Sequence, residues 1–219
     1  MKDERKPPKR RYDSAGRQAA AAQRRLAVIV AALSTFEERG WAGARLQDVS
    51  SAAGVSQKTV EATFGTKAAL LRAAVDYAIR GDTEALPMPR REAVAVMETS
   101  ADAATFLRLH AHHLRVINTR SARIASVVEN AARADPAVAA LWKRMNHNRA
   151  YAVAWAAETL LGKRGHRRGL TREHVQAIFW VALDWGTHRT LTDLAGLDPD
   201  GYENWLDCYY RDTLLPRNS

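Results

Sequence analysis

Hydrophobic residues recur at steps of three and four from residue 26 onward, which is the spacing of an amphipathic helix. The first series consists of Leu26, Ile29, Val30, Leu33 and Phe36. Gly40 follows this series and predicts the end of a long helix. Leu46 and Val49 then predict a short second helix, and Gly54 after it offers the positive φ that a sharp turn requires.

A third helix has a complete start signal at Ser56. Its hydroxyl can cap the helix, and Val55 and Val60 around the cap form a hydrophobic staple. Thr66 then caps a fourth helix that runs toward Arg80. The pattern therefore predicts two short helices, joined by a tight turn, between two longer ones.

The rest of the chain keeps a helical pattern with little β-branched alternation. Further helix starts are indicated by Asp135, Thr171 and Asp198, and the two aspartates are each followed by proline. Gly81 and the proline-containing segment 87–89 mark a linker. The sequence thus predicts an all-α fold with about nine helices.

Basic residues are concentrated at the N-terminal end. The chain carries 33 Lys and Arg against 24 Asp and Glu, and residues 1–80 hold 15 of the basic and 8 of the acidic side chains. Residues 81–219 hold the remaining 18 and 16, so this part is nearly neutral. Such asymmetry indicates an N-terminal module that meets a polyanion, although a solvated basic tail would have the same composition.

The cysteine content and the longest apolar run bear on the compartment. Cys208 is the single cysteine, which excludes an intramolecular disulfide and fits a reducing cytoplasm. The apolar run 26–33 is too short to span a bilayer, and arginines and glutamates flank it. We therefore expect a cytoplasmic protein without a membrane partner.

The segment from Leu46 to Phe64 has the layout of a helix-turn-helix. In that motif the second helix enters the DNA major groove and presents its N-terminal side chains to base edges. The side chains placed to face DNA are Gln57, Lys58, Thr59, Ala62 and Thr63. An ordinary helical hairpin has the same layout, but the basic N-terminal third favours binding of double-stranded DNA.

The same segment resembles TetR-type transcriptional regulators in the order and spacing of its residues, over about residues 20–75. The matching positions are Arg25, Phe36, Gly40, Trp41, Leu46, Asp48, Val49, Ala53, Gly54, Val55, Ser56, Thr59, Val60, Phe64, Lys67 and Leu70. The resemblance implies that the third helix reads the major groove and that Lys67, at the start of the fourth helix, contacts a phosphate. A helix N-terminus favours anions, which agrees with that role.

Two positions in the recognition helix depart from the family pattern. Glu61 stands where the family usually has tyrosine, and Thr63 stands where histidine or tyrosine is usual. Phosphates repel a carboxylate, so Glu61 either turns away to pair with a basic neighbour or weakens nonspecific binding. Arg45, near the second helix, is a candidate to replace the lost phosphate contact.

These observations divide the chain into four expected segments. Residues 1–17 would form a disordered basic arm, and residues 18–80 a helix-turn-helix DNA-binding domain. Residues 81–90 would form a linker, and residues 91–219 a helical domain for effector binding and dimerisation.

Aromatic residues gather in the part of the sequence that would surround a ligand cavity. The candidate effector-binding residues are Phe106, His110, His113, Trp142, Met145, Trp155, Trp180 and Asp184, with Tyr151 and Trp185 in the same region. Such a lining suits an apolar or aromatic small molecule and favours a strongly anionic one less. Aromatic residues at helical spacing are also the ordinary content of a core.

The last two helices resemble those that commonly form the dimer interface in TetR-type proteins. The candidate interface residues are Val175, Ile178, Phe179, Ala182, Tyr202, Trp205, Leu206 and Tyr209. They could form an apolar four-helix interface across a two-fold axis. The dimer would then present two recognition helices to the two halves of a palindromic operator. Packing within a single chain is the alternative for these residues.

Together these features favour a homodimeric DNA-binding repressor that a small-molecule effector releases from its operator. A nucleoid-type architectural protein would instead use the basic arm without sequence preference. An all-helical enzyme is disfavoured because the sequence shows no nucleophile–base motif and no cofactor fingerprint, so we expect no catalytic residue and no cofactor. His110 and His113 share a helical face but lack a third ligand, so we expect no metal.

Overall fold

The computed structural model describes residues 14–216, and every structural statement below concerns that range. This part of the chain contains ten α-helices, one 3-10 turn, one π-helical turn and no strand. The elements are α1 Ser14–Gly43, α2 Leu46–Ala52, α3 Gln57–Phe64, α4 Lys67–Arg80, η1 Met88–Arg90, α5 Glu92–Thr99, α6 Ala103–Ala131, α7 Pro136–Leu161, α8 Arg172–Ala182, α9 Trp185–Arg189, η2 Thr190–Leu194 and α10 Pro199–Leu214. The predicted all-α fold is confirmed, with ten α-helices where about nine were expected.

The helix starts that the sequence predicts are the observed ones. Ser56 caps α3 by accepting a hydrogen bond of 3.1 Å from the Thr59 N–H. The corresponding caps of α4, α7, α8 and α10 are Thr66, Asp135, Thr171 and Asp198. Because each side-chain oxygen satisfies a backbone N–H that the helix leaves unpaired, these caps fix where the helices begin.

The long first helix is interrupted near its C-terminal end. Gly40 has φ 64° and ψ −178°, so the straight part of α1 ends at the residue that the sequence pattern indicates. α1 begins at Ser14, so residues 14–17, expected within the basic arm, are helical. Residues 1–13 of the expected arm lie outside the described range.

Within residues 14–216, α1 is the one helix that is long and apolar enough to cross a membrane, judged by length and composition alone. Part of its hydropathy comes from Val28, Ile29 and Phe36, which are buried in the protein. The helix packs along both α4 and α6. These contacts account for the buried apolar side chains as core residues of the fold, whereas Leu26 and Val30 on the same helix are exposed.

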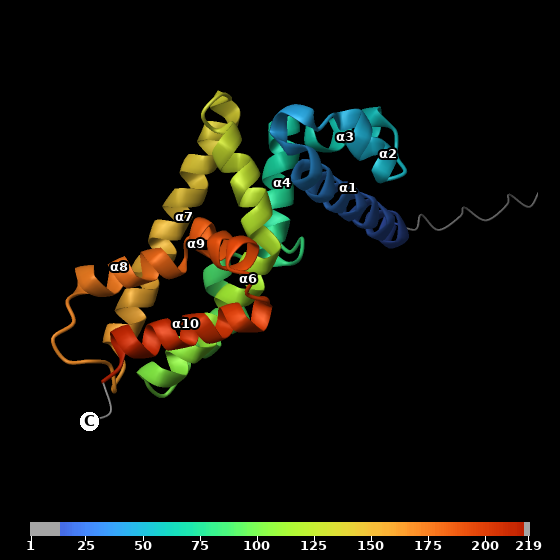
Figure 1. Cartoon of the computed structure of the whole chain (residues 1–219). Coiled ribbons are helices and arrows are strands. Elements are labelled where there is room, and N and C mark those ends of the chain that lie inside the picture. The colour runs from blue at the N-terminus through green and yellow to red at the C-terminus, as the bar shows by residue number, and fades with distance from the viewer. Residues whose placement is uncertain (1–13, 217–219) are drawn as a thin grey trace, which may run out of the picture.

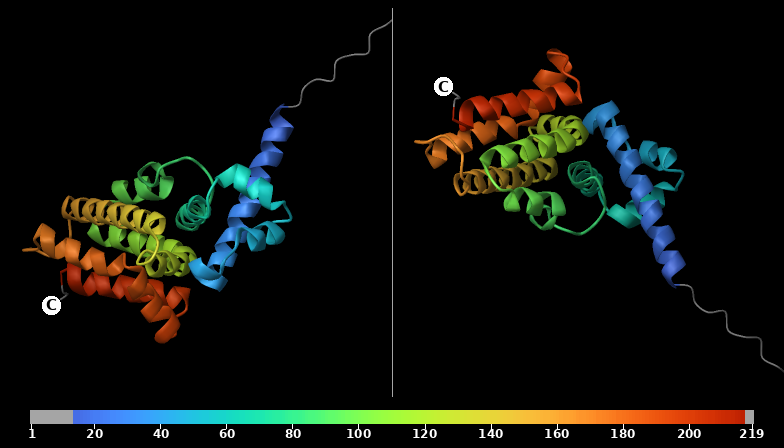
Figure 2. Two further views of the ribbon diagram at one scale, coloured as in Figure 1. Left: turned by 90° about the horizontal axis from the view of Figure 1, so that it is seen from above. Right: turned by 90° about the horizontal axis from the view of Figure 1, so that it is seen from below.

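The helices are arranged from one end of the molecule to the other (Figure 1). α1, α2 and α3 lie together at one end, and the C-terminus lies at the other. α4 connects the two parts, and α6 and α7 form a long antiparallel hairpin against which it packs. Figure 2 shows α8 and α10 on one side of this hairpin and α5 on the opposite side.

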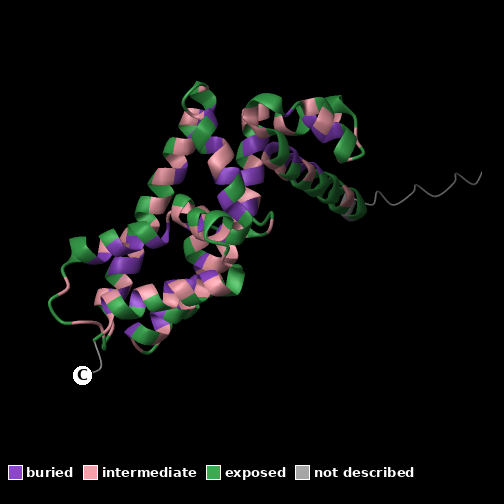
Figure 3. Ribbon diagram, viewed as in Figure 1, coloured by how far each residue is buried: buried purple, intermediate pink, exposed green. Residues whose placement is uncertain are grey.

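Two hydrophobic cores hold this arrangement, and their buried residues lie on the facing sides of the helices (Figure 3). The upper core joins α1–α4 to one end of the α6–α7 hairpin and includes Phe36, Val60, Leu71, Ile124 and Leu141. The lower core joins α5 to the opposite end of the hairpin and to α8 and α10, and it includes Met97, Phe106, Leu160, Phe179 and Leu206. The segments 18–80 and 91–219 therefore share the upper core, and their division into domains stays a prediction from the sequence.

The expected linker, residues 81–90, begins with a tightly constrained turn. Gly81 has φ +85°, and a Cβ at this position would lie 2.3 Å from Nη1 of Arg120. Arg120 donates hydrogen bonds of 3.2 Å to two backbone carbonyls in the last turn of α4. Next to it, Arg91 donates two hydrogen bonds to Asp82, at 2.6 and 2.9 Å, and they lower the pKa of Asp82 to about 2.

Candidate DNA-binding surface and effector cavity

α2 and α3 form the predicted helix-turn-helix. Gly54 between them has φ +65°, the turn conformation expected of it. Val60 is buried, and Val55 and Phe64 are half-buried against the upper core. These three apolar contacts orient α3 so that its opposite side lies in solvent.

The residues predicted to face DNA lie on that solvent side. Gln57, Lys58 and Thr63 are exposed, and Thr59 is half-buried. Thr63 donates a hydrogen bond of 2.7 Å to the backbone carbonyl of Thr59. Because these side chains project from one capped helix, they can approach a groove together, and their roles toward DNA stay predictions.

Glu61 has a partner that the sequence did not indicate. Its carboxylate accepts a hydrogen bond of 2.8 Å from the side-chain amide of Gln57, one turn earlier on α3. Of the two alternatives for Glu61, pairing with a basic neighbour is not the observed one, since this partner is a neutral amide, and weaker nonspecific binding stays a prediction. This bond leaves Gln57 a second amide N–H and its carbonyl oxygen for pairing with a base.

Lys67 and Arg45, the two expected phosphate contacts, differ in their surroundings. Lys67 begins α4, donates from Nζ to the backbone carbonyl of Trp41, and lies 4.4 Å from the centre of the Trp41 ring. Partial burial lowers the pKa of Lys67. Arg45 is exposed at the start of α2, where its backbone N–H donates to the Asp48 carboxylate at 3.1 Å. Arg45 is thus free to reach a phosphate, whereas Lys67 already has one of its three N–H donors on Trp41.

A cavity of about 480 Å³ lies between α4, α6 and α7, bordered by the linker and by the start of α9. Small-molecule sites commonly measure roughly 300–1,000 Å³. Apolar walls come from Leu114, Ile117, Met145, Ala152 and Leu183. The cavity therefore has the size and much of the lining of a ligand site.

The structure brings half of the predicted effector-binding residues to this cavity. His110, His113, Met145 and Trp155 line it, as do Tyr151 and Trp185. The sequence did not single out the cavity's arginines, Arg80, Arg144 and Arg149, because arginines at helical spacing usually lie on a solvated face.

The other predicted residues lie outside the lining. Phe106 is fully buried beside Trp155 in the lower core. Trp142 packs against Trp185, with 6.1 Å between the ring centres. Trp180 is 37% exposed on α8, and Asp184 caps α9. Phe106 and Trp142 thus support residues that line the cavity, and a direct role in ligand binding stays a prediction.

Burial keeps two histidines of the cavity, His110 and His113, neutral. Burial lowers the pKa of His110 to about 3, and it lowers the pKa of His113 to about 4 with a contribution from Arg120. Nδ1 of His110 lies 2.9 Å from the Tyr210 hydroxyl on α10. Within residues 14–216 no group of three or more His, Cys, Asp or Glu side chains is arranged to hold a metal ion.

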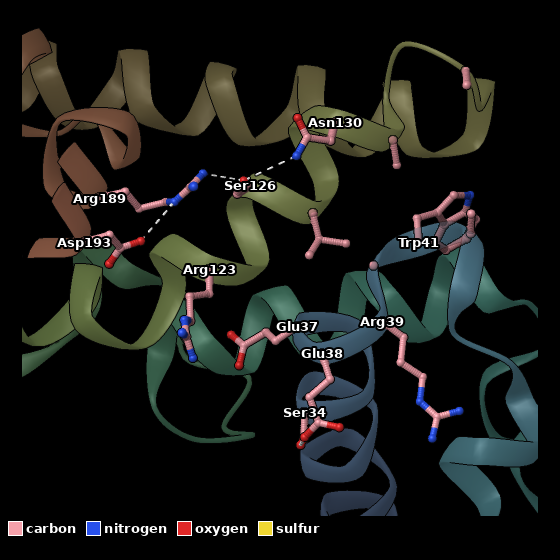
Figure 4. Close-up of a pocket in the computed structure, with 15 residues that line it drawn as sticks. Ser34, Glu37, Glu38, Arg39, Trp41, Arg123, Ser126, Asn130, Arg189 and Asp193 are labelled. Carbon is pink, nitrogen blue, oxygen red and sulfur yellow. Dashed lines mark hydrogen bonds and ion pairs between the residues drawn. The ribbon is translucent and has the colours of Figure 1, made fainter.

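A second hollow, of about 940 Å³, opens between α1, α6 and the α9–η2 segment (Figure 4). Arg189 bridges its wall by donating to Ser126 and pairing with Asp193 at 3.6 Å. Burial raises the pKa of Glu37, and Arg123 opposes that rise. Most polar groups of this second hollow pair with one another. Because α1 and α6 form its two sides, its width depends on how α1 packs against α6.

Most of the predicted dimer residues are packed inside the chain itself. Val175, Ile178, Phe179, Ala182, Tyr202 and Leu206 are all buried in the lower core. A side chain buried by its own chain has little surface left for a partner, so the alternative of intrachain packing applies to these six. Trp205 and Tyr209 are half-buried and stack with ring centres 5.2 Å apart. Val181 on α8 is 42% exposed.

Comparisons with known proteins agree with this geometry. Residues 28–74 match the family model described as bacterial regulatory proteins, tetR family. This range contains α2, α3 and most of α4. No curated protein matches the chain.

Solved structures with a similar fold include three bacterial regulators. A transcriptional regulator from Saccharomonospora viridis in complex with choline is 19% identical, with TM-score 0.66, covering 89% of this chain and 99% of that one. NalD, the secondary repressor of the MexAB-OprM multidrug efflux pump in Pseudomonas aeruginosa, is 21% identical, with TM-score 0.65, covering 91% and 100%. A TetR-family transcriptional regulator from a Rhodococcus species is 18% identical, with TM-score 0.63, covering 87% and 98%.

Proposed function

We propose that the chain is a TetR-family regulator, because residues 28–74 match that family's model and the fold resembles solved regulators, and that it is a homodimeric repressor in the cytoplasm. In this proposal α3 of each protomer reads one half of a palindromic operator. A small molecule in the cavity between α4, α6 and α7 then releases the protein from DNA.

The solvent-facing side of α3 is the observation that carries the DNA-binding proposal. The Ser56 cap and buried Val60 fix this helix, while Gln57 and Lys58 remain exposed at its leading end. Amide and ammonium side chains at the start of a recognition helix can donate to adenine and guanine edges in the major groove.

The cavity wall provides a path from ligand to DNA. Asp76, Ile79 and Arg80 on α4 border the cavity, and α4 begins at Lys67 beside the recognition helix. Asp76 also accepts a hydrogen bond of 3.2 Å from Arg144 on α7. A ligand that changes this contact shifts α4, and linkage then requires ligand and operator to weaken each other by the same factor.

Selection of bound fragments from genomic DNA tests the proposal. We expect a palindrome whose half-sites lie about one helical turn apart, bound far more tightly than random DNA at the same salt concentration. Equal affinity for the best recovered fragment and for random DNA would favour the nucleoid-type architectural alternative. Compounds that then release the operator fragment would identify effectors.

A further inference from the structure

The cavity between α4, α6 and α7 carries more positive than negative charge. Three arginines line it, Arg80, Arg144 and Arg149, against one aspartate, Asp76. The buried His110 and the half-buried His113 stay neutral near pH 7 because withdrawal from water lowers both pKa values. The positive charge therefore belongs to guanidinium groups, which remain charged at every physiological pH.

Two of these arginines keep hydrogen-bond donors unused. Arg149 donates from Nη1 to Asp184 at 2.9 Å, and its buried Nε has no hydrogen-bond partner within residues 14–216. Arg144 donates from Nη2 to Asp76 at 3.2 Å, which is its one hydrogen bond to the described chain. The side chains of Arg144 and Arg149 are only 32% and 17% exposed. A guanidinium withdrawn this far from water gains from an anionic partner.

The carboxylates nearby are already occupied. Asp76 pairs with Arg72 and Arg80, each at 3.8 Å, and with Arg144 at 3.2 Å. Asp184 pairs with Arg149 and accepts the Thr187 N–H at 2.8 Å in capping α9. A cationic ligand would therefore have to displace an arginine from its carboxylate.

The aromatic faces near the arginines are occupied as well. The guanidinium of Arg149 lies 5.1 Å from the centre of the Trp180 ring and 5.4 Å from that of Trp185. A quaternary ammonium such as choline, which binds one of the similar regulators, requires open aromatic faces or a free carboxylate. The cavity of this chain offers neither beside Arg149.

The apolar walls of the cavity indicate the shape and length of the apolar part of the ligand. Leu114, Ile117, Met145 and Ala152 form an apolar surface, and Trp155 closes it beside His110. The stretch of α6 from His110 to Asn118 borders the cavity and corresponds to about 12 Å of helix. An unbranched or aromatic body of about that length fits this space.

We infer that the cavity takes an organic monocarboxylate, with its carboxylate on Arg144 and Arg149 and its apolar body against Leu114, Met145 and Trp155. This inference rests on the proposed function only for its regulatory consequence. The ligand class follows from the charges and donors of the cavity, and it differs from the weakly polar ligand that the aromatic content of the sequence favours. A carboxylate on Arg144 competes with Asp76 and so acts directly on α4.

Three probes of equal chain length test the ligand class: decanoate, 1-decanol and decyltrimethylammonium. Calorimetry on the full chain measures affinity, and intrinsic tryptophan fluorescence, to which Trp155 and Trp185 of the cavity contribute, reports occupancy, with every probe below its micellar concentration. We expect decanoate to bind about 10- to 100-fold more tightly than decanol, the range for hydrogen bonds to a charged group. We expect decyltrimethylammonium to bind more weakly than decanol.

Variants then place the carboxylate. Arg149→Gln and Arg144→Gln should each weaken decanoate binding about tenfold or more and leave decanol binding within about twofold. Arg108→Gln, at an exposed arginine on the outer side of α6, is the matched control and should bind decanoate as the wild type does. If a glutamine variant unfolds at a much lower temperature than the wild type, Arg149→Lys or Arg144→Lys replaces it. Lysine keeps the positive charge but cannot make the bidentate contact with a carboxylate.

Each result decides one claim. Equal or tighter binding of decanol or decyltrimethylammonium overturns the monocarboxylate inference, as does decanoate binding that survives both glutamine variants. Operator affinity is measured separately with each probe. A probe other than decanoate that releases the operator would keep the proposed function and reject this ligand class, whereas tight decanoate binding without operator release would keep the ligand class and reject ligand control.

Discussion

The indole Nε1 of Trp41 donates a hydrogen bond of 3.1 Å to Oδ2 of Asp135, the residue that caps α7. Trp41 follows the break at Gly40, and its carbonyl and ring hold the Lys67 ammonium at the start of α4. One side chain thus connects the start of α4 to the start of α7. This connection adds to the upper core in positioning the helix-turn-helix relative to the hairpin.

Trp41→Phe should lower both stability and operator affinity. Phenylalanine keeps a ring against Phe36 but loses the donor to Asp135, a loss of about 0.5–1.5 kcal/mol in the free energy of unfolding. Urea unfolding and operator titration measure the two effects. Trp185→Phe is the control, since it loses a similar 3.1 Å bond to Ser121 away from α1, and it should spare DNA affinity. Equal effects of both variants on DNA would refute a special role for Trp41.

Gly81→Ala should destabilise the protein by about 1–3 kcal/mol. The residue has φ +85°, and the new methyl group would lie 2.3 Å from Arg120, which caps the end of α4. Gly162→Ala is a matched control because Gly162 has φ −75° and its nearest neighbour would be 3.5 Å away. Thermal or urea unfolding compares the two variants, and a similar stability for both would contradict the expected strain.

Stability should fall as the pH is lowered from 7.5 to 5.5. An unfolded histidine has a pKa near 6.5, whereas burial holds the pKa of folded His110 at about 3 and that of His113 at about 4. The unfolded chain therefore binds protons that the folded chain does not, and each histidine costs about 1.4 kcal/mol by pH 5.5. Burial lowers the pKa of His188 as well, which acts in the same direction.

Urea midpoints across this pH range measure the slope. His113→Gln removes one of the titrating groups and should flatten the dependence relative to the wild type. A slope that is unchanged in this variant would show that His113 is not buried in its neutral form.

Lys58→Ala and Lys67→Ala should weaken operator binding in different ways. Lys58 is exposed at the leading end of α3, so its loss should cost about 1–3 kcal/mol on the operator and relax preference at one base pair. Loss of a phosphate contact at Lys67 should weaken all sequences alike and reduce the salt slope by about one. Lys143→Ala, at an exposed site on α7, is the control. Titrations with operator and random DNA at several salt concentrations separate these patterns. Identical behaviour of the two variants would contradict the placement of α3 in the major groove with Lys67 on a phosphate.

Val181→Arg should weaken the proposed homodimer. Val181 is 42% exposed on α8, the helix that packs against α10, whose half-buried aromatic residues stay candidates for the interface. A charge placed in an apolar interface loses its hydration without a partner, so dissociation should increase more than tenfold. Val96→Arg, at a site 47% exposed on α5, is the matched control. Sedimentation velocity measures the oligomer, and a Val181→Arg dimer as tight as the wild type would exclude this face.

Local signals in the sequence were sufficient for most of the helices and for the helix-turn-helix. Ser56, Thr66 and Asp135 cap the helices they were expected to cap, and Gly40 and Gly54 adopt positive φ where a turn was expected. Capping and glycine conformation depend on neighbours within about four residues, so the chain order alone determines them. Local sequence also determines which side of α3 is exposed, because the spacing of Val55, Val60 and Phe64 turns all three toward one core.

Only the tertiary structure decided which of the other residues meet. Val175, Phe179 and Leu206 have the apolar spacing of an interface, yet their own chain buries them, since helical periodicity shows a buried face without showing what covers it. Arg144 and Arg149 likewise have the pattern of solvent-exposed positions, but packing of α7 against α4 and α9 turns them to Asp76 and Asp184. The charge of the cavity therefore arises from contacts between residues 35 and 68 positions apart, which no local pattern can specify.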